Sequence, residues 1–192
     1  MARSISLPED LRKIRDAYAT SGRAAESLVA GLSDRQLAFQ PKPGSWSIAH
    51  CLDHLAIASH EYAGPMTKAM EKARAKGARP FSGLSPKFYE RLFIGTLEPP
   101  PKWKMPAPKK IVPPLARGPR AAVDAYFQAN HEIRNLLPLA SELDLNSVHF
   151  PNPFVPLVTF TVGAGLLILA AHERRHLWQA QNVKRAPGFP QT

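Results

Sequence analysis

Residues 172–176 read HERRH, which places two histidines four positions apart with a glutamate after the first. On a helix, side chains at positions i and i+4 lie one above the other, so these two histidines can hold one metal ion together. The same letters occur in zinc proteases, where the glutamate is the general base. The position of a third ligand decides between a protease and a different kind of metal site.

That third ligand is not found after the motif. In zinc proteases it lies downstream, yet the stretch that follows His176, LWQAQNVKRAPGFPQT, contains no His, Asp or Glu. The sequence therefore disfavours a protease and requires an upstream ligand. The upstream histidines are His50, His54, His60, His131 and His149.

His54 is the best upstream candidate because of its neighbours. It lies about two turns into an expected helix, on the side shared by Cys51, Leu55 and Ala58. Small and apolar residues along one stripe indicate the face of a helix that points inward. Three neutral imidazoles with one open position are typical of a catalytic metal site. From the residues alone, two satisfied histidines on one helix and an unrelated core histidine explain the pattern equally well.

Four long helices must position these residues. Apolar residues recur at three- and four-residue steps. They predict helices near residues 7–32, 47–77, 119–139 and 159–183. No convincing strand is present, and the length suits one domain over residues 1–192. The sequence therefore predicts an all-α protein, a four-helix bundle.

Local signals define the helix ends and breaks. Ser33 and Gln36 can cap a short turn, and Ser47 and Thr159 are natural N-caps for the second and fourth long helices. The Gly64-Pro65 pair should kink or interrupt the second helix.

The connection between the second and third helices, residues 77–118, is rich in proline and too long for a plain loop. It should contain a short helix, KFYERLFI, at residues 87–94. A connection of this length can cross the bundle, so the helices on either side of it can run parallel. This predicts an up-down-down-up topology with a Pro-rich crossover.

Composition limits where the chain works. The single Cys51 cannot form an intramolecular disulfide, and the N-terminal residues lack the apolar stretch of a secretory signal, so we expect a cytoplasmic protein. Residues 153–171 are nineteen residues without a charge, close to the length that spans a bilayer. Pro153 and Pro156 discourage helix at the start of that run, which favours a core helix over a membrane span.

The formal charge of +10 is partly concentrated in the crossover, which has no acid between Glu98 and Asp124. A solvated basic loop is the simpler interpretation, and docking of an acidic partner is the alternative. No nucleic-acid-binding module is recognisable, so no specific nucleic acid is expected. The basic residues are Lys102, Lys104, Lys109, Lys110, Arg117 and Arg120.

The sequence resembles the DinB-like superfamily of four-helix-bundle metalloproteins. The resemblance rests on GLSDRQLAFQPKPGSWSIAHCLDHL at 31–55, FPNP at 150–153 and TFTVGAGLLILAAHERRHLWQAQNV at 159–183. It implies the same up-down-down-up bundle and a divalent ion, zinc or nickel. The metal triad of the family corresponds to His54, His172 and His176 here.

Three further residues are candidates for roles around that ion. At His50 the family commonly has Glu or Gln, which completes a capping box, so His50 can be a fourth ligand, a proton carrier or a capping residue. Cys51 can bind metal as a thiolate, or serve as a small core residue. Glu173 can be a general base, or face a neighbouring helix or solvent.

The resemblance implies two versions of an enzyme. In one, the ion activates a low-molecular-weight thiol for transfer to an electrophile; in the other, it activates water for hydrolysis of a small molecule. Trp46, Phe88 and Trp103 are candidate pocket walls, and a homodimer is compatible with the sequence. The alternative is a non-catalytic metal-binding or interaction protein whose basic crossover binds an acidic partner.

Overall fold

The computed structural model describes residues 7–101, 106–114 and 117–191. In chain order the helices are α1 (Glu9–Val29), α2 (Asp34–Leu37), α3 (Ile48–Ala75), α4 (Phe88–Leu97), the 3₁₀ turn η1 (Lys109–Ile111), α5 (Pro119–Asn135), α6 (Leu137–Ala140) and α7 (Val162–Lys184). Two short strands, β1 (His149–Pro151) and β2 (Thr159–Thr161), precede α7.

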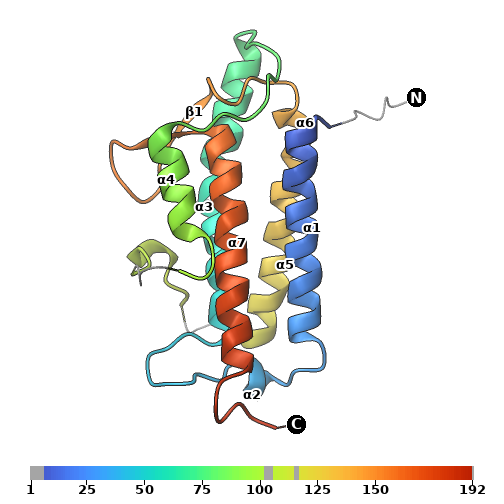
Figure 1. Cartoon of the computed structure of the whole chain (residues 1–192), viewed down its shortest axis with the longest axis vertical. Coiled ribbons are helices and arrows are strands. Elements are labelled where there is room, and N and C mark those ends of the chain that lie inside the picture. Colours follow the sequence, from blue (N-terminus) through green and yellow to red (C-terminus); the bar gives the residue numbers. More distant parts are fainter. Residues whose placement is uncertain (1–6, 102–105, 115–116, 192) are drawn as a thin grey trace, which may run out of the picture.

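The four long helices α1, α3, α5 and α7 lie side by side along the longest axis of the molecule (Figure 1). Helix α3 packs against both α5 and α7, and α1 packs against the same two helices. The all-α bundle expected from the sequence is confirmed. In Figure 1 the chain descends along α1 and α7 and ascends along α3 and α5, and the segment between α3 and α5 returns over the length of the bundle.

Side-chain caps begin three of the helices. Ser33 and Gln36 form a capping box at α2, and Ser47 accepts a hydrogen bond from the backbone N–H of His50 at α3, both as predicted. The cap of α7 is Thr161, not Thr159 as expected. The expectation of no strand was also wrong, because β2 pairs antiparallel with β1 and thereby occupies Thr159 to Thr161.

Helix α3 runs through Pro65 without interruption, so the expected interruption is wrong, while the alternative, a kink, stays a prediction. Tyr62, Met66 and Met70 on either side of it are buried on one face, and this packing holds the helix together across the proline. The third long helix is shorter than predicted, since α5 ends at Asn135 and α6 continues after it.

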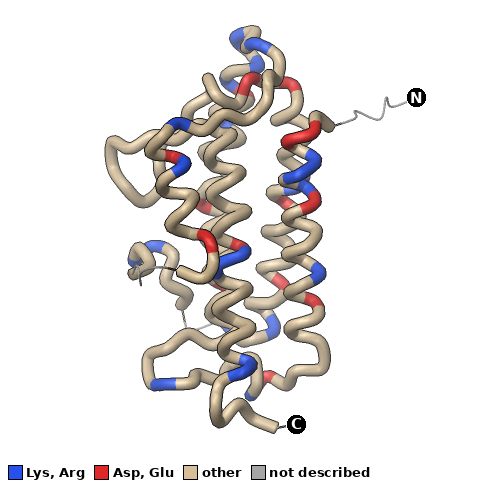
Figure 2. Tube along the Cα trace, in the orientation of Figure 1, with Lys and Arg blue, Asp and Glu red and all other residues tan. Residues whose placement is uncertain are grey.

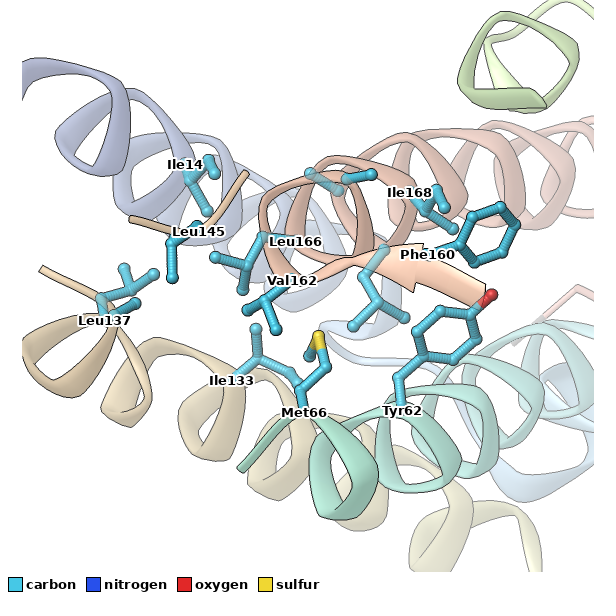
Figure 3. Close-up of a cluster of buried hydrophobic side chains, with 14 of the residues drawn as sticks. Ile14, Tyr62, Met66, Ile133, Leu137, Leu145, Phe160, Val162, Leu166 and Ile168 are labelled. Carbon is cyan, nitrogen blue, oxygen red and sulfur yellow. The ribbon is translucent and has the colours of Figure 1, made fainter. Parts of the chain in front are cut away.

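The core is built where α3, α5 and α7 meet. Figure 3 shows Met66 of α3 beside Ile133 of α5 and Val162 of α7, with Tyr62 and Phe160 further along. A second cluster, around Leu52, Tyr126 and Leu177, fills the other part of the bundle. Within the uncharged run 153–171, most residues from Phe160 onward are buried in the core, whereas Val155 and Leu157 are exposed. Among the described helices none is long and apolar enough to span a membrane.

The crossover is fixed to α3 at several points. Ile111 of η1 is buried, Lys110 Nζ lies 2.6 Å from Glu61 Oε2, and Arg117 Nε lies 3.4 Å from the buried Asp53 Oδ1. Figure 2 shows Lys and Arg distributed over several elements of the bundle as well as the crossover. Lys102 and Lys104 lie outside the described residues. Lys110 and Arg117, two of the basic residues assigned to a solvated loop, are paired with acids of α3.

The contact between α3 and α7 predicts the effect of enlarging Gly165. A Cβ at this position would lie 2.7 Å from Met66 Sδ and 2.8 Å from the ring of Phe150. We expect Gly165→Ala to lower the free energy of unfolding by about 1–3 kcal/mol, because a packed core cannot absorb the extra carbon without strain.

Urea denaturation measures this effect. Gly64→Ala is the control, since a Cβ at position 64 meets nothing within 4 Å and alanine is the better helix former. A Gly165→Ala protein as stable as the wild type would contradict the described packing of α7.

Candidate metal centre

Three imidazoles meet between α3 and α7. His54 comes from α3, and His172 and His176 come from successive turns of α7. The ring centroid of His54 lies 4.8 Å from that of His172 and 4.4 Å from that of His176. The ring centroids of His172 and His176 are 4.6 Å apart. One potential ligand atom from each residue lies within 4.8 Å of the others. The three residues chosen from the sequence are thus brought together.

Hydrogen bonds at the far side of two rings determine which nitrogen is available. His54 Nδ1 lies 2.7 Å from the backbone carbonyl oxygen of Ile111, and His176 Nδ1 lies 2.9 Å from Gln179 Oε1. Both partners are acceptors, so each Nδ1 carries the proton and each Nε2 keeps a lone pair. Such outer partners orient the imidazoles that ligate metal ions.

The surroundings keep all three imidazoles neutral. Burial lowers the pKa of His54 to about 4 and the pKa of His176 to about 3, while the pKa of His172 falls well below its ordinary value. Burial is the largest cause in each case, and the nearby charge of Arg175 lowers all three further. Neutral imidazoles are the form that binds metal, so the donor set is ready at neutral pH.

The donor set fits a divalent ion. His54 Nε2 and His172 Nε2 lie 3.0 Å apart, and two nitrogens on one tetrahedral zinc ion at ~2.0–2.1 Å are about 3.3 Å apart. Three protein nitrogens leave a coordination position open for a small molecule, as in catalytic zinc sites. Trp46 lies against the cluster, with its ring centroid 4.6 Å from His54 and 5.5 Å from His176.

Glu173 faces the opposite side of α7. Its carboxylate is buried and accepts hydrogen bonds from Tyr126 Oη, at 3.1 Å, and from Asn130 Nδ2, at 3.2 and 3.3 Å. Both partners belong to α5. Burial raises the pKa of Glu173 to about 7, against these hydrogen bonds, which lower it. The described contacts connect Glu173 to the bundle interior, and its assignment as a general base stays a prediction.

His50 and Cys51 occupy the start of α3. His50 Nδ1 lies 2.7 Å from Ser47 Oγ and accepts a hydrogen bond from the backbone N–H of Ser47. The imidazole thus completes the capping box that Glu or Gln would otherwise complete. Cys51 is fully buried, and burial raises the pKa of its thiol, which disfavours the thiolate needed for metal binding.

A pocket of about 760 Å³ lies in front of the three histidines. Of the predicted wall residues, Trp46 lines it, Phe88 is 75 % exposed and does not, and Trp103 lies outside the described residues. Phe93 of α4 and Phe154 of the β1–β2 connection line it instead.

Two groups that orient the histidines were not predicted from the sequence. The Ile111 carbonyl belongs to the backbone, so no residue type could reveal it. Gln179 lies three residues after His176, and this spacing was the available signal.

Fold and site together define a helical bundle with a cluster of three histidines, able to hold a metal ion, between two of its helices. The family model of the DinB superfamily matches residues 17–180, and the chain belongs to this superfamily. Among solved structures, the chain is similar to YfiT from Bacillus subtilis, described as a probable metal-dependent hydrolase with an unusual four-helix bundle topology. The likeness has a TM-score of 0.60 at 15 % identity, over 99 % of this chain and 94 % of that one. No match was found among curated proteins.

The raised pKa of Glu173 predicts a pH-dependent stability. The folded-state pKa is about 7 and the ordinary value is 4.5, so the contribution of Glu173 is fully present below about pH 4.5 and is lost as the pH rises through 7. We expect the stability of the metal-free wild type, relative to Glu173→Gln, to fall by about 3 kcal/mol over this range.

Subtracting the free energy of unfolding of Glu173→Gln from that of the wild type at each pH isolates the contribution of Glu173, because the three histidines are present in both proteins. Denaturant unfolding at a series of pH values, with a chelator present, gives the two curves. Curves that stay parallel from pH 4.5 to pH 8 would show that Glu173 is already ionised in the folded state.

The contacts of His50 predict a capping effect without metal loss. We expect His50→Ala to lower the free energy of unfolding by about 1 kcal/mol, because Ser47 loses its reciprocal partner while keeping its own bond to the backbone. The bound metal, measured by elemental analysis, should be unchanged. Loss of metal from this variant would make His50 a ligand.

Proposed function

We propose that this protein is a divalent-metal-dependent enzyme acting on a small molecule held in the pocket beside His54, His172 and His176. The observation that carries the proposal is that three neutral imidazoles from two helices converge at the wall of a pocket of about 760 Å³. A structural zinc site is closed by four protein ligands, whereas this donor set leaves a position that opens onto the pocket.

The surrounding residues support such a reaction. The Ile111 carbonyl and Gln179 hold two of the imidazoles in fixed orientations, and Trp46 covers the cluster from one side. His54, His172 and His176 would hold a divalent ion, which would lower the pKa of water or of a thiol and so make either a nucleophile near neutral pH.

Two reactions are compatible with this arrangement. One is hydrolysis of a small substrate with water as the nucleophile; the other is transfer of a low-molecular-weight thiol to an electrophile. Among the described lining residues none is a carboxylate, so the ion rather than an acidic side chain would favour deprotonation of either nucleophile. Product analysis with and without an added thiol distinguishes the two.

The identity of the ion and the setting of the reaction belong to the same proposal. Zinc and nickel both accept imidazole ligands, and we propose one of them as the native metal. The single, buried Cys51 suits the cytoplasm, and a homodimer is compatible with the proposed enzyme.

The binding-protein alternative rests on the basic crossover and has less support. Lys110 and Arg117 are paired with Glu61 and Asp53 of α3, so part of the basic charge is already matched within the chain. If removing the metal changes no catalytic activity of the protein, and the protein binds a polyanion less tightly as salt is added, this alternative would be favoured.

Elemental analysis of protein purified without a His tag tests the metal site. We expect about one zinc or nickel ion per chain in the wild type, and loss of it in His54→Ala and in His172→Ala, because two remaining imidazoles hold an ion far more weakly. Loss from both variants would place one ion between α3 and α7.

His60→Ala is the matched control, since His60 is an exposed histidine of α3 whose Nδ1 lies 3.6 Å from Glu132 Oε2, outside the cluster. It should keep its metal. A wild-type protein that stays metal-free after zinc or nickel is supplied would overturn the proposed function.

A further inference from the structure

The pocket is much larger than a metal ion and a water molecule require. Its described walls come from residues 44–46, α3, α4, the crossover, the β1–β2 connection and α7. Five of the wall side chains are large and aromatic: Trp46, Tyr62, Phe93, Phe154 and Trp178. Leu97 and Ile168 add aliphatic surface. A ligand that fills this space must therefore present a mainly apolar body.

The charged side chain in the described part of the pocket wall is positive. Among the described residues that line it, none is acidic, and Arg175 is the one with a permanent positive charge. Arg175 Nη1 donates a hydrogen bond to the backbone carbonyl oxygen of Thr96, at 3.0 Å, which anchors the guanidinium to the end of α4. Its charge reaches all three imidazoles of the cluster and lowers the pKa of each.

The other two charged residues of the HERRH motif, Glu173 and Arg174, do not change the charge of the described pocket lining, because neither of them lines the pocket. Arg174 lies outside the pocket lining and forms a bidentate ion pair with Glu98, at the end of α4. Glu173 is buried on the far side of α7, where Asn130 and Tyr126 donate to it. Glu98 and Glu173 are thus matched by other residues, and a bound divalent ion would add to the positive potential of the pocket.

We propose that the pocket selects a small molecule with a mainly apolar body and one acidic group, such as a carboxylate, and that Arg175 is the residue that attracts this group. The inference rests on the proposed function, since it assigns the substrate class of the same site. A positive charge with low-dielectric walls acts strongly on an anion, because little solvent screens it.

Two dyes with the same ring system test the proposal. The first is 8-anilinonaphthalene-1-sulfonate, and the second is N-phenyl-1-naphthylamine, which lacks the sulfonate. Both fluoresce when they enter an apolar pocket. Fluorescence titrations give the Kd of each dye for the wild type, for Arg175→Gln and for Arg174→Gln, which removes the same charge from the same helix outside the pocket.

We expect Arg175→Gln to raise the Kd of the sulfonate dye about tenfold or more, since a charge-assisted contact is lost. The Kd of the neutral dye should stay within about twofold, because the apolar walls remain. Arg174→Gln should leave both dyes unchanged. Arg175→Lys, which keeps the charge without the planar fork, should give a smaller loss for the sulfonate dye.

Two results would overturn the proposal. An unchanged Kd for the sulfonate dye in Arg175→Gln would show that Arg175 does not select anions. An equal loss for both dyes would show that Arg175 shapes the pocket rather than its charge. The titrations are run on metal-loaded and on chelated protein, and the effect of Arg175→Gln is expected in both, so its failure is distinct from failure of the metal site.

Discussion

Helices α3 and α7 approach so closely that a Cβ at Gly165 would lie 2.7 Å from Met66 Sδ, and this close packing is the constraint that makes the histidine cluster possible. An imidazole extends only a few ångströms from its helix, so His54 can meet His172 and His176 only if the two backbones are held near each other along their length. The tight contact at Gly165 fixes the separation, and the second core cluster, around Leu52 and Leu177, holds the helices together beyond the site.

The crossover between α3 and α5 orients His54 and forms part of the pocket wall. Its 3₁₀ turn η1 places the Ile111 carbonyl 2.7 Å from His54 Nδ1, and the pairs of Lys110 with Glu61 and of Arg117 with Asp53 hold that turn against α3. The same segment supplies part of the pocket wall. One connection thus both orients an imidazole of the cluster and forms part of the pocket wall, which gives a physical reason for its length.

The sequence predicted the features that depend on local chemistry. The i, i+4 histidines, the inward stripe around His54 and the Ser33 and Ser47 caps are each visible within one or two helical turns, and each is present. The failures involve contacts between distant segments. Strand β2 forms by pairing with β1 eight or more residues away, and a three-residue strand carries too little alternation to be recognised. Helix α3 continues through Pro65 because tertiary burial outweighs a local breaker.

The HERRH segment shows why identical letters support different chemistry in different folds. Successive helical residues are rotated by about 100°, and in this bundle α7 has a partner on each side. His172 and His176 point to α3 and the pocket, Glu173 enters the interior toward α5, Arg174 turns outward to Glu98, and Arg175 lines the pocket. A zinc protease uses the glutamate at the metal, whereas here the partners of Glu173 on α5 hold it in the core. Among the described residues that line the pocket beside the cluster, the charged one is therefore an arginine and not a glutamate.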